Sequence, residues 1–214
     1  MIAHALTIVL NELNKHLVDN YASDPSQVVL GNLAEGLVTA SSDSGNAGVS
    51  RDKLCLSVVN IKEEKTLKNV PNHVRNDTTL SVTYENPPVF LNFQILLTAT
   101  HLNYTHALLM LSRAIQFFQF KNVFTQDNVV PISIQKDWPT NTLDRLESFK
   151  LIFDLYSPTM EEVNHLWGTL GGKQYPFVLY TLRMLDLKFH AIQSESGLIT
   201  EVVTDFYHKD TKAG

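Results

Sequence analysis

Cysteine is nearly absent from this sequence: Cys55 is the only one among 214 residues. A lone cysteine cannot form a disulfide within the chain, and a cluster of thiolate ligands around a metal is excluded. Such sparse use of cysteine fits a reducing compartment. Cys55 lies inside an apolar run, so we expect its thiol to be a small buried hydrophobe with a raised pKa and not a nucleophile.

Long apolar runs and clusters of positive charge are also missing. No run approaches the roughly 20 apolar residues that a membrane helix needs, and no basic segment precedes the apolar Met1 to Leu10, as it would in a secretory signal. The 17 basic residues are scattered, and with 22 acidic residues the formal net charge is -5. Because affinity for nucleic acid depends on concentrated Lys and Arg, we expect neither nucleic-acid binding nor membrane insertion. The chain is expected to be soluble where it is made.

The motifs of common enzyme classes are incomplete. The stretch GTLGGK ends at Lys173, but a phosphate-binding loop needs a glycine where Trp167 stands and a hydroxyl residue where Gln174 stands. His101 and His106 are five residues apart, and the zinc motif His-Glu-x-x-His does not occur. A Gly-x-Ser-x-Gly elbow is missing too. The sequence therefore predicts no catalytic, metal-ligating or cofactor-binding residue.

Three helices are predicted where apolar residues recur every three or four positions: residues 2–19, 104–120 and 160–170. In the first, Asn11, Glu12 and Asn14 fall between the apolar positions, which is typical of an amphipathic helix with one polar face. The third begins with Thr159 and Glu162 at the spacing of a capping box. Each of these helices has an apolar side that requires a core.

Strands are predicted where apolar and polar residues alternate: residues 53–64, 89–100, 148–155 and 176–189, with shorter ones in 26–38 and 197–207. Helices and strands follow one another without an internal repeat or a separating linker. We therefore expect a single α/β (α+β) domain, a mixed β-sheet with packed helices. Its predicted extent is residues 1–206, with residues 207–214 as a frayed C-terminal tail.

Two polar segments are predicted as connections. Thr39 to Ser50 is small, polar and glycine-bearing, too poor in apolar groups to bury anything, and is expected to be a mobile surface loop. Lys65 to Asn86 is a second polar connection. Within the strand 89–100, Asn92 and Gln94 can bind neighbouring backbone, a ligand or another subunit, and the sequence leaves these three alternatives open.

Six stretches, in chain order, carry a resemblance to a known family: LNELNKHL, VVLGNLAEG, LSVVNIKEEKTLKN, PPVFLNFQILLTA, YTHALLMLSRAIQFFQFKNVFT and EEVNHLWGTLGGKQYPFVLYTLRMLDL. They resemble the N-terminal domain of the cap, or tail-terminator, proteins of extracellular contractile injection systems, which are phage-tail-like particles. The resemblance covers about residues 2–190. Its most specific part runs from Asn164 to Lys173, with Pro176 after it.

The resemblance implies a tail-terminator-like fold and a subunit that forms a ring, usually a homohexamer, at the distal end of the inner tube and sheath. Such a cap ends polymerisation and sets particle length, and it is neither an enzyme nor a cofactor-binding protein. Only residues 197–214 could serve as the arm with which some relatives engage the sheath, so tube capping is the firmer expectation. The protein would be cytoplasmic during assembly and then part of a released or cell-anchored particle.

Two groups of candidate contact residues follow from this interpretation. The first is the family motif: Asn164, His165, Trp167, Gly168, Gly171, Gly172 and Lys173. These residues are expected to hold the corner between a helix and a strand, with the tryptophan in the core, the glycines allowing tight backbone and the lysine exposed; direct contact with a partner is the alternative. The second is a flexible contact loop expected to order against tube or sheath: Ser42, Asp43, Gly45, Asn46 and Gly48.

Two other functions remain as alternatives at this point. One is a baseplate or neck adaptor of the same kind of particle. The other is a small-molecule enzyme in which Asn92, Gln94, His101 and His165 line a pocket. A deep, closed pocket that gathers these four side chains would favour the enzyme.

Overall fold

The computed structural model describes residues 1–24, 26–38, 48–66, 71, 73–84, 86–146, 148–187, 194–197 and 201–204. The chain divides into two compact units, of which the larger comprises Met1–Leu67 and Val89–Leu187 and the smaller comprises Lys68–Pro88 and Lys188–Gly214. The larger unit is a single mixed α/β domain, so the predicted fold class is confirmed.

A six-stranded sheet organises the larger unit, in the order β1-β4-β7-β10-β9-β8. Its strands are β1 (Val28–Leu30), β4 (Leu54–Glu63), β7 (Val89–Ala99), β8 (Val123–Thr125), β9 (Lys150–Tyr156) and β10 (Phe177–Leu187). β1 runs parallel to β4, and every other neighbouring pair is antiparallel. Four α-helices pack on this sheet: α1 (Ile2–Tyr21), α2 (Tyr104–Phe120), α3 (Pro131–Gln135) and α4 (Met160–Thr169).

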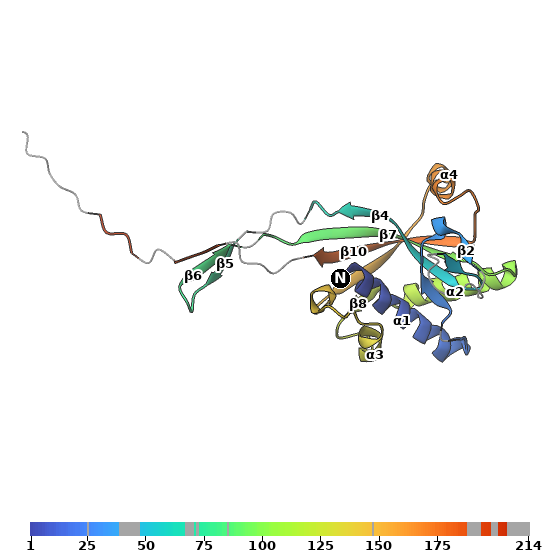
Figure 1. The fold of residues 1–214 in the computed structure, drawn as a ribbon, viewed down its shortest axis with the longest axis horizontal. Helices are drawn as coiled ribbons and strands as arrows, with labels where there is room; N and C mark the ends of the chain where they lie inside the picture. The colour runs from blue at the N-terminus through green and yellow to red at the C-terminus, as the bar shows by residue number, and fades with distance from the viewer. Residues whose placement is uncertain are drawn as a thin grey trace, which may run out of the picture. The chain divides into compact units, whose positions relative to one another are not determined.

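One face of the sheet packs against α1, α2 and α3, which lie together in Figure 1. Leu13 and Leu17 of α1 are fully buried against this face, and an aromatic cluster fills its centre. The ring of Phe118 lies 4.9 Å from that of Phe153 and 4.7 Å from that of Tyr180, between centroids. These contacts fix α2 across β9 and β10, since aromatic rings contribute the largest buried areas in a core.

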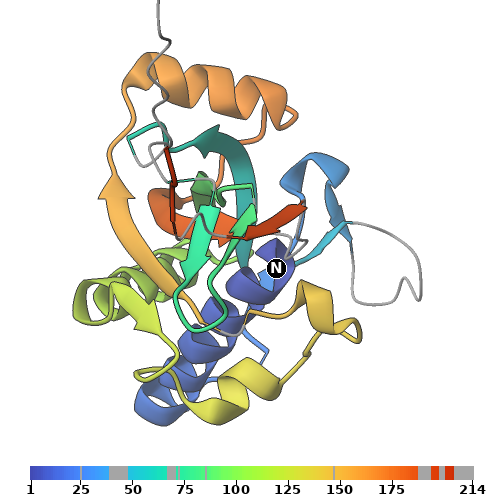
Figure 2. The same cartoon turned by 90° about the vertical axis from the view of Figure 1, so that its left-hand side faces the viewer.

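The opposite face packs against α4, the 3-10 helix η1 (Leu33–Glu35) and a two-stranded parallel pair, β2 (Leu37–Val38) and β3 (Val49–Ser50). In Figure 2, α4 lies across the sheet from α1 and α2. Cys55 lies in this second core with no exposed surface, and burial raises the pKa of its thiol, as expected. Beyond the first turn of α4 the same face becomes polar, at Asn92 and Gln94, so α4 covers only part of it.

The polar face predicted for the first helix is buried, so that expectation is wrong. Asn11, Glu12 and Asn14 of α1 are only 5–6% exposed. Asn11 donates to the carbonyl of Ser133 beside α3 at 3.2 Å, and Asn14 binds the backbone of β1. Long-range elements cover these side chains and bind most of their polar groups, as burial favours, whereas Asn11 Oδ1 has no partner among the described residues.

The segment 39–50 departs from the predicted loop at its end. Residues 39–47 lie outside the described residues, but Val49 and Ser50 form β3. Val49 is 2% exposed in the second core, so the expectation that this segment buries nothing is wrong. Gly31 has a packing reason to lack a side chain, because a Cβ there would stand 2.6 Å from Cγ2 of Val49.

The connection predicted for residues 65–86 contains two strands of the smaller unit. β5 (His73–Asn76) and β6 (Ser81–Tyr84) form a hairpin, and β11 (Ser194–Gly197) adds to β6, so the sheet order is β11-β6-β5. A short strand was predicted within residues 197–207. β11 shares only Gly197 with that range, and residues 201–204 form neither helix nor strand. The domain end at residue 206 stays a prediction, because residues 205–214 lie outside the described range.

The loop predicted between residues 120 and 148 also holds structure, namely β8, α3 and the 3-10 helix η2 (Thr142–Asp144). By contrast, the predicted main strands and all three predicted helices are present, with ends shifted by at most a few residues. Searched over its described residues, the protein shows no helix with the length and apolar character to span a membrane.

Candidate interface around helix α4 and the sheet edges

The N-terminus of α4 carries the predicted capping box. The Thr159 hydroxyl accepts from the Glu162 amide at 3.3 Å, and the Glu162 carboxylate accepts from the Thr159 amide at 2.8 Å. Glu162 also accepts from the Tyr156 hydroxyl of β9 at 2.8 Å. The hydrogen bond from the Thr159 backbone N–H has the larger effect and that from the Tyr156 hydroxyl the next, and both hold the pKa of the Glu162 carboxyl below its ordinary value. Helix α4 is therefore tied to the sheet through its first turn.

The C-terminus of α4 ends on two glycines in the left-handed region. Gly171 and Gly172 have φ values of 94° and 77°, and the Gly172 amide donates to the Trp167 carbonyl at 2.7 Å. This is the hydrogen bond of a Schellman cap, which favours residues without a Cβ. Trp167 itself is 5% exposed, with its ring 5.3 Å from that of Phe177 of β10, whereas Lys173 is exposed.

The other three motif residues lie on the outer surface of α4. Asn164 and Gly168 are exposed, and His165 is exposed beside Glu161, with 3.8 Å between Nε2 and Oε1. Gly168 has ordinary helical backbone, and a Cβ on it would meet nothing within 4 Å. The expectation that all three glycines serve tight backbone geometry is therefore wrong for Gly168.

Two alanine substitutions are expected to have opposite effects on this cap. Gly171→Ala should lower the free energy of unfolding by about 1 kcal/mol, because an L-residue is strained at positive φ. Gly168→Ala should raise it by about 0.5–1 kcal/mol, because alanine is the better helix former and the space is open. Urea denaturation of both variants beside wild type measures this, and destabilisation by Gly168→Ala would contradict it.

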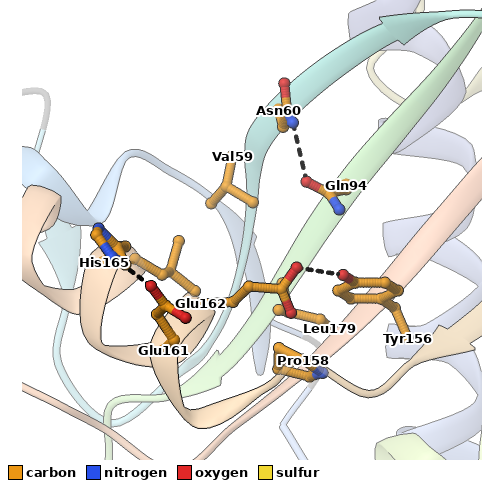
Figure 3. A pocket seen from close by; sticks show the side chains of 10 residues that line it. Val59, Asn60, Gln94, Tyr156, Pro158, Glu161, Glu162, His165 and Leu179 are labelled. Atoms are coloured by element: carbon orange, nitrogen blue, oxygen red, sulfur yellow. Dashed lines mark hydrogen bonds and ion pairs between the residues drawn. The ribbon is translucent and has the colours of Figure 1, made fainter.

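A hollow of about 400 Å³ lies between the first turns of α4 and the sheet (Figure 3). Val59, Leu166 and Leu179 give it apolar walls, and polar groups stand at its rim. Among them, the Asn60 amide donates to the Gln94 oxygen at 3.0 Å across β4 and β7. The hollow opens on solvent at side chains that already bind one another, which is the character of a surface groove.

A second hollow of about 310 Å³ shares Gln94 and Tyr156 with the first and continues along the polar part of the sheet face. Here Asn92 donates to Glu64 at 2.8 Å. Hydrogen bonds to its carboxylate, chiefly from Thr66 and next from Asn92, lower the pKa of Glu64 to about 2. Within the chain, Asn92 and Gln94 thus bind the side chains of Glu64 and Asn60, and neither bond is to the neighbouring backbone. Contact of the two residues with a ligand or another subunit stays a prediction.

His101 lies away from these hollows, at the end of β7. It follows Gln94 by seven residues, which is about 23 Å along an extended strand. It is 9% exposed, its ring lies 4.7 Å from that of His106, and burial followed by the charge of His106 lowers its pKa. The four residues of the enzyme alternative are therefore not gathered. Within the described residues, no group of three His, Cys, Asp or Glu side chains is placed to hold a metal ion.

In each of the two outermost strands of the six-stranded sheet, β1 and β8, an asparagine side chain binds outward backbone groups. At β1, the Asn14 amide accepts from the Val28 N–H at 2.9 Å and donates to the Val28 carbonyl at 3.2 Å. At β8, Asn128 accepts from the Thr125 N–H and donates to the Val123 carbonyl, both at 2.9 Å. Each amide occupies backbone groups that another strand would need, a form of protection against edge pairing.

The model of the Pvc16 N-terminal domain family matches residues 5–201. The chain belongs to the Pvc16 N-terminal domain family. This confirms the resemblance to the N-terminal domain of injection-system caps that the sequence motifs carried. A comparison with curated proteins finds no match.

Two solved structures share the fold of this Pvc16 N-terminal domain. One is the sheath/tube terminator, in its extended state, of the extracellular contractile injection system PVC, with a TM-score of 0.57, 10% identity, and coverage of 100% of this chain and 65% of that chain. The other is the tube-terminating cap of the anti-feeding prophage, with a TM-score of 0.54, 13% identity, and coverage of 92% and 60%. The chain thus spans less than two thirds of either protein.

The predicted contact residues of this Pvc16 N-terminal domain are only partly placed. Ser42, Asp43, Gly45 and Asn46 lie outside the described residues. Gly48 is described and half-buried, and a Cβ there would stand 2.7 Å from Cγ1 of Val38, so its glycine is needed for packing. Contact of either group with a partner stays a prediction.

Sequence reasoning missed Asn14 and Asn128. Asn14 sits among the polar positions of an amphipathic helix, and nothing in its spacing indicates a strand edge 14 residues away. Asn128 lies in a predicted loop beside a strand that was not predicted. For Asn128, the separation of three residues from Thr125 is a local signal of a turn.

Proposed function

We propose that this protein is a structural cap, or tail terminator, of a contractile injection system. It forms a ring, a homohexamer as the resemblance implies, on the distal end of the inner tube and sheath, ends their polymerisation and so sets the particle length. The observation that carries the proposal is the family match over residues 5–201. The shared fold with a sheath/tube terminator and a tube-terminating cap supports it.

The surface chemistry agrees with a role that needs no catalysis. The two described hollows on the second sheet face are open, and their polar side chains bind one another. A terminator must also stop further addition, and sheet edges closed by Asn14 and Asn128 give strands of other proteins no ladder to extend there. We place assembly in the cytoplasm, followed by incorporation into the particle.

Particle length tests the function directly. Cells that make the particle without this protein should give tails of irregular length or with uncapped ends, seen by electron microscopy, and adding back the full chain should restore a narrow length distribution. A labelled chain should mark the end opposite the baseplate. Normal lengths without the protein, or a label at the baseplate or neck, would contradict the proposal.

The loop residues Ser42, Asp43, Gly45 and Asn46 are part of the same proposal, as the contact with tube or sheath. Replacing residues 40–47 by a short glycine-serine linker should leave the fold intact and lower the fraction of capped particles. The matched control carries a substitution of the exposed Lys15 on α1. Full capping by the linker variant would remove this part of the proposal and leave the cap function in place.

A further inference from the structure

We propose that the outer edge of β4 from Val58 to Lys62, named here the free edge, pairs with residues Glu201–Thr204 of a second copy of this chain. The inference rests on the proposed function, because it concerns the contact between neighbouring copies in a ring. A closed ring needs two different complementary surfaces on every copy. The free edge is one, and Glu201–Thr204 is the other.

The argument begins with the two edges that are closed. Asn14 occupies both outward backbone groups of Val28 in β1, and Asn128 occupies the outward N–H of Thr125 and the outward C=O of Val123 in β8. A strand from another copy would have to displace a side chain at either place. Pairing between copies is therefore directed to an edge that no amide protects.

Strand β4 offers such an edge because its outer neighbour is short. β1 pairs only with Leu54–Leu56, and the Leu54 N–H and Leu56 C=O both face it. Alternation along the strand turns the N–H and C=O of Val58 to the same side. The register of β4 on β7 shifts between Val58 and Asn60. Beyond the shift, the Glu64 N–H donates to the Phe90 carbonyl of β7, so the backbone of Lys62 faces β7 and that of Ile61 faces outward. Within the described part of the chain no strand lies there. β4, β7 and β10 continue side by side past the helices in this region (Figure 1).

Side chains on the free edge fit a strand partner of one particular kind. Val58 is 37% exposed and Ile61 is 51% exposed, so both leave apolar surface in water that a paired strand could cover. Lys62 is exposed next to Ile61. A lysine on an edge disfavours most strands, so a strand that brings a carboxylate opposite Lys62 is selected over others.

The segment Glu201–Thr204 has this chemistry. It is exposed throughout, forms neither helix nor strand, and leaves Val202 and Val203 77% and 74% exposed. Two adjacent valines are among the residues that favour strands, and their exposure to water is unfavourable until a partner covers them. Glu201 supplies the negative charge that Lys62 selects.

These residues also fix the direction of pairing. With Glu201 opposite Lys62, an antiparallel strand sets Val202 opposite Ile61, so an ion pair and an apolar pair form on the two faces of the added strand. A parallel strand in the same register would set Val202 opposite Glu63. The antiparallel arrangement is therefore the one in which charge and apolar contacts agree.

A charge exchange tests the pairing in the full chain. Lys62→Glu and Glu201→Lys should each weaken association between copies at least about tenfold, because like charges then lie opposite each other. The double variant should restore wild-type association. Sedimentation velocity over a concentration series and the fraction of capped particles measure the effect, with Lys15→Glu on α1 as the control. Equal urea midpoints for all variants show that they are folded.

Mixing two cysteine variants tests the register between molecules. Ile61→Cys mixed with Val202→Cys should give a disulfide-linked dimer under mild oxidation, whereas either variant alone should not, and the native Cys55 is fully buried. Ile61→Cys mixed with Val203→Cys is the control, since Val203 faces the other side.

The possible outcomes separate the pairing from the function. Unchanged association in both single charge variants, or failure of the double variant to restore it, overturns the pairing while the cap function stands. Loss of tube or sheath binding with normal association between copies also overturns it, because the free edge then belongs to that partner. A wild-type chain that neither associates nor occupies particle ends contradicts the proposed function itself.

Discussion

Glu12→Ala is expected to lower the free energy of unfolding by about 3–5 kcal/mol, the usual cost of removing one partner of a buried ion pair. Glu12 in α1 is 6% exposed, and its carboxylate binds two groups that lie more than 100 residues away in the sequence. Lys121 Nζ, at the end of α2, lies 2.7 Å from one oxygen, and the Val130 N–H before α3 donates to the other at 3.0 Å. The substitution leaves both without a carboxylate.

The controls separate this charge from the packing of α1. Glu12→Gln keeps an acceptor for the Val130 N–H but leaves Lys121 unneutralised, so its loss should fall between those of wild type and Glu12→Ala. Lys15→Ala breaks the exposed ion pair with Asp19 one turn away and should give no resolvable change. Urea unfolding at neutral pH measures all three. A loss under 1 kcal/mol for Glu12→Ala would show that water compensates the lysine.

The same helix shows where prediction from sequence ends. Its apolar period predicted α1 within two residues at each end, because that period is a local property of a helix. Which polar residues stay in water depends instead on what covers the helix. Asn11 is buried against Ser133 and Glu12 against Lys121, partners more than 100 residues away, and a local pattern carries no information about them.

The strands divide in the same physical way. β4 and β7 are long and apolar, so their alternation was visible. β5 is exposed along its whole length, and β8 has three residues, so neither carries an apolar pattern of sufficient length. Strand order follows from packing between distant elements, such as the parallel pairing of β1 with β4, and was not derivable.

At the candidate interface, local chemistry was predictable and contacts were not. The capping box of Thr159 and Glu162 follows from spacing alone, as does the glycine cap at Gly171. Gly168 was grouped with the other glycines by proximity, whereas its conformation is that of an ordinary helical residue. The hydrogen bonds that the side-chain amides of Asn14 and Asn128 make to the edge strands could not be predicted before the sheet itself was known.

Trp167→Ala is the other substitution with a large expected effect, and it tests whether the family motif is scaffold or contact surface. The indole is 5% exposed and joins Val163 of α4 to Leu179 of β10 in the second core. Removing it leaves a cavity under α4 and should lower the free energy of unfolding by about 3–5 kcal/mol. Urea denaturation measures this loss.

Trp167→Phe is the matched control. It keeps a ring against Phe177, and it removes a buried indole N–H that has no acceptor among the described residues, so part of the lost packing is offset. Its loss should be well below that of Trp167→Ala. Equal losses would show that the indole shape, and not burial of an aromatic ring, holds α4 on the sheet.

The exposed motif residues complete the test. If the motif is scaffold alone, Lys173→Ala and Asn164→Ala should change neither the unfolding midpoint nor the capping of particles, because both side chains lie in solvent. If it is also a contact surface, they should lower capping at an unchanged midpoint, whereas Trp167→Ala lowers both. Comparing midpoint with capping for these three variants assigns the motif, since a scaffold residue acts on capping only through the fold and a contact residue acts on it directly.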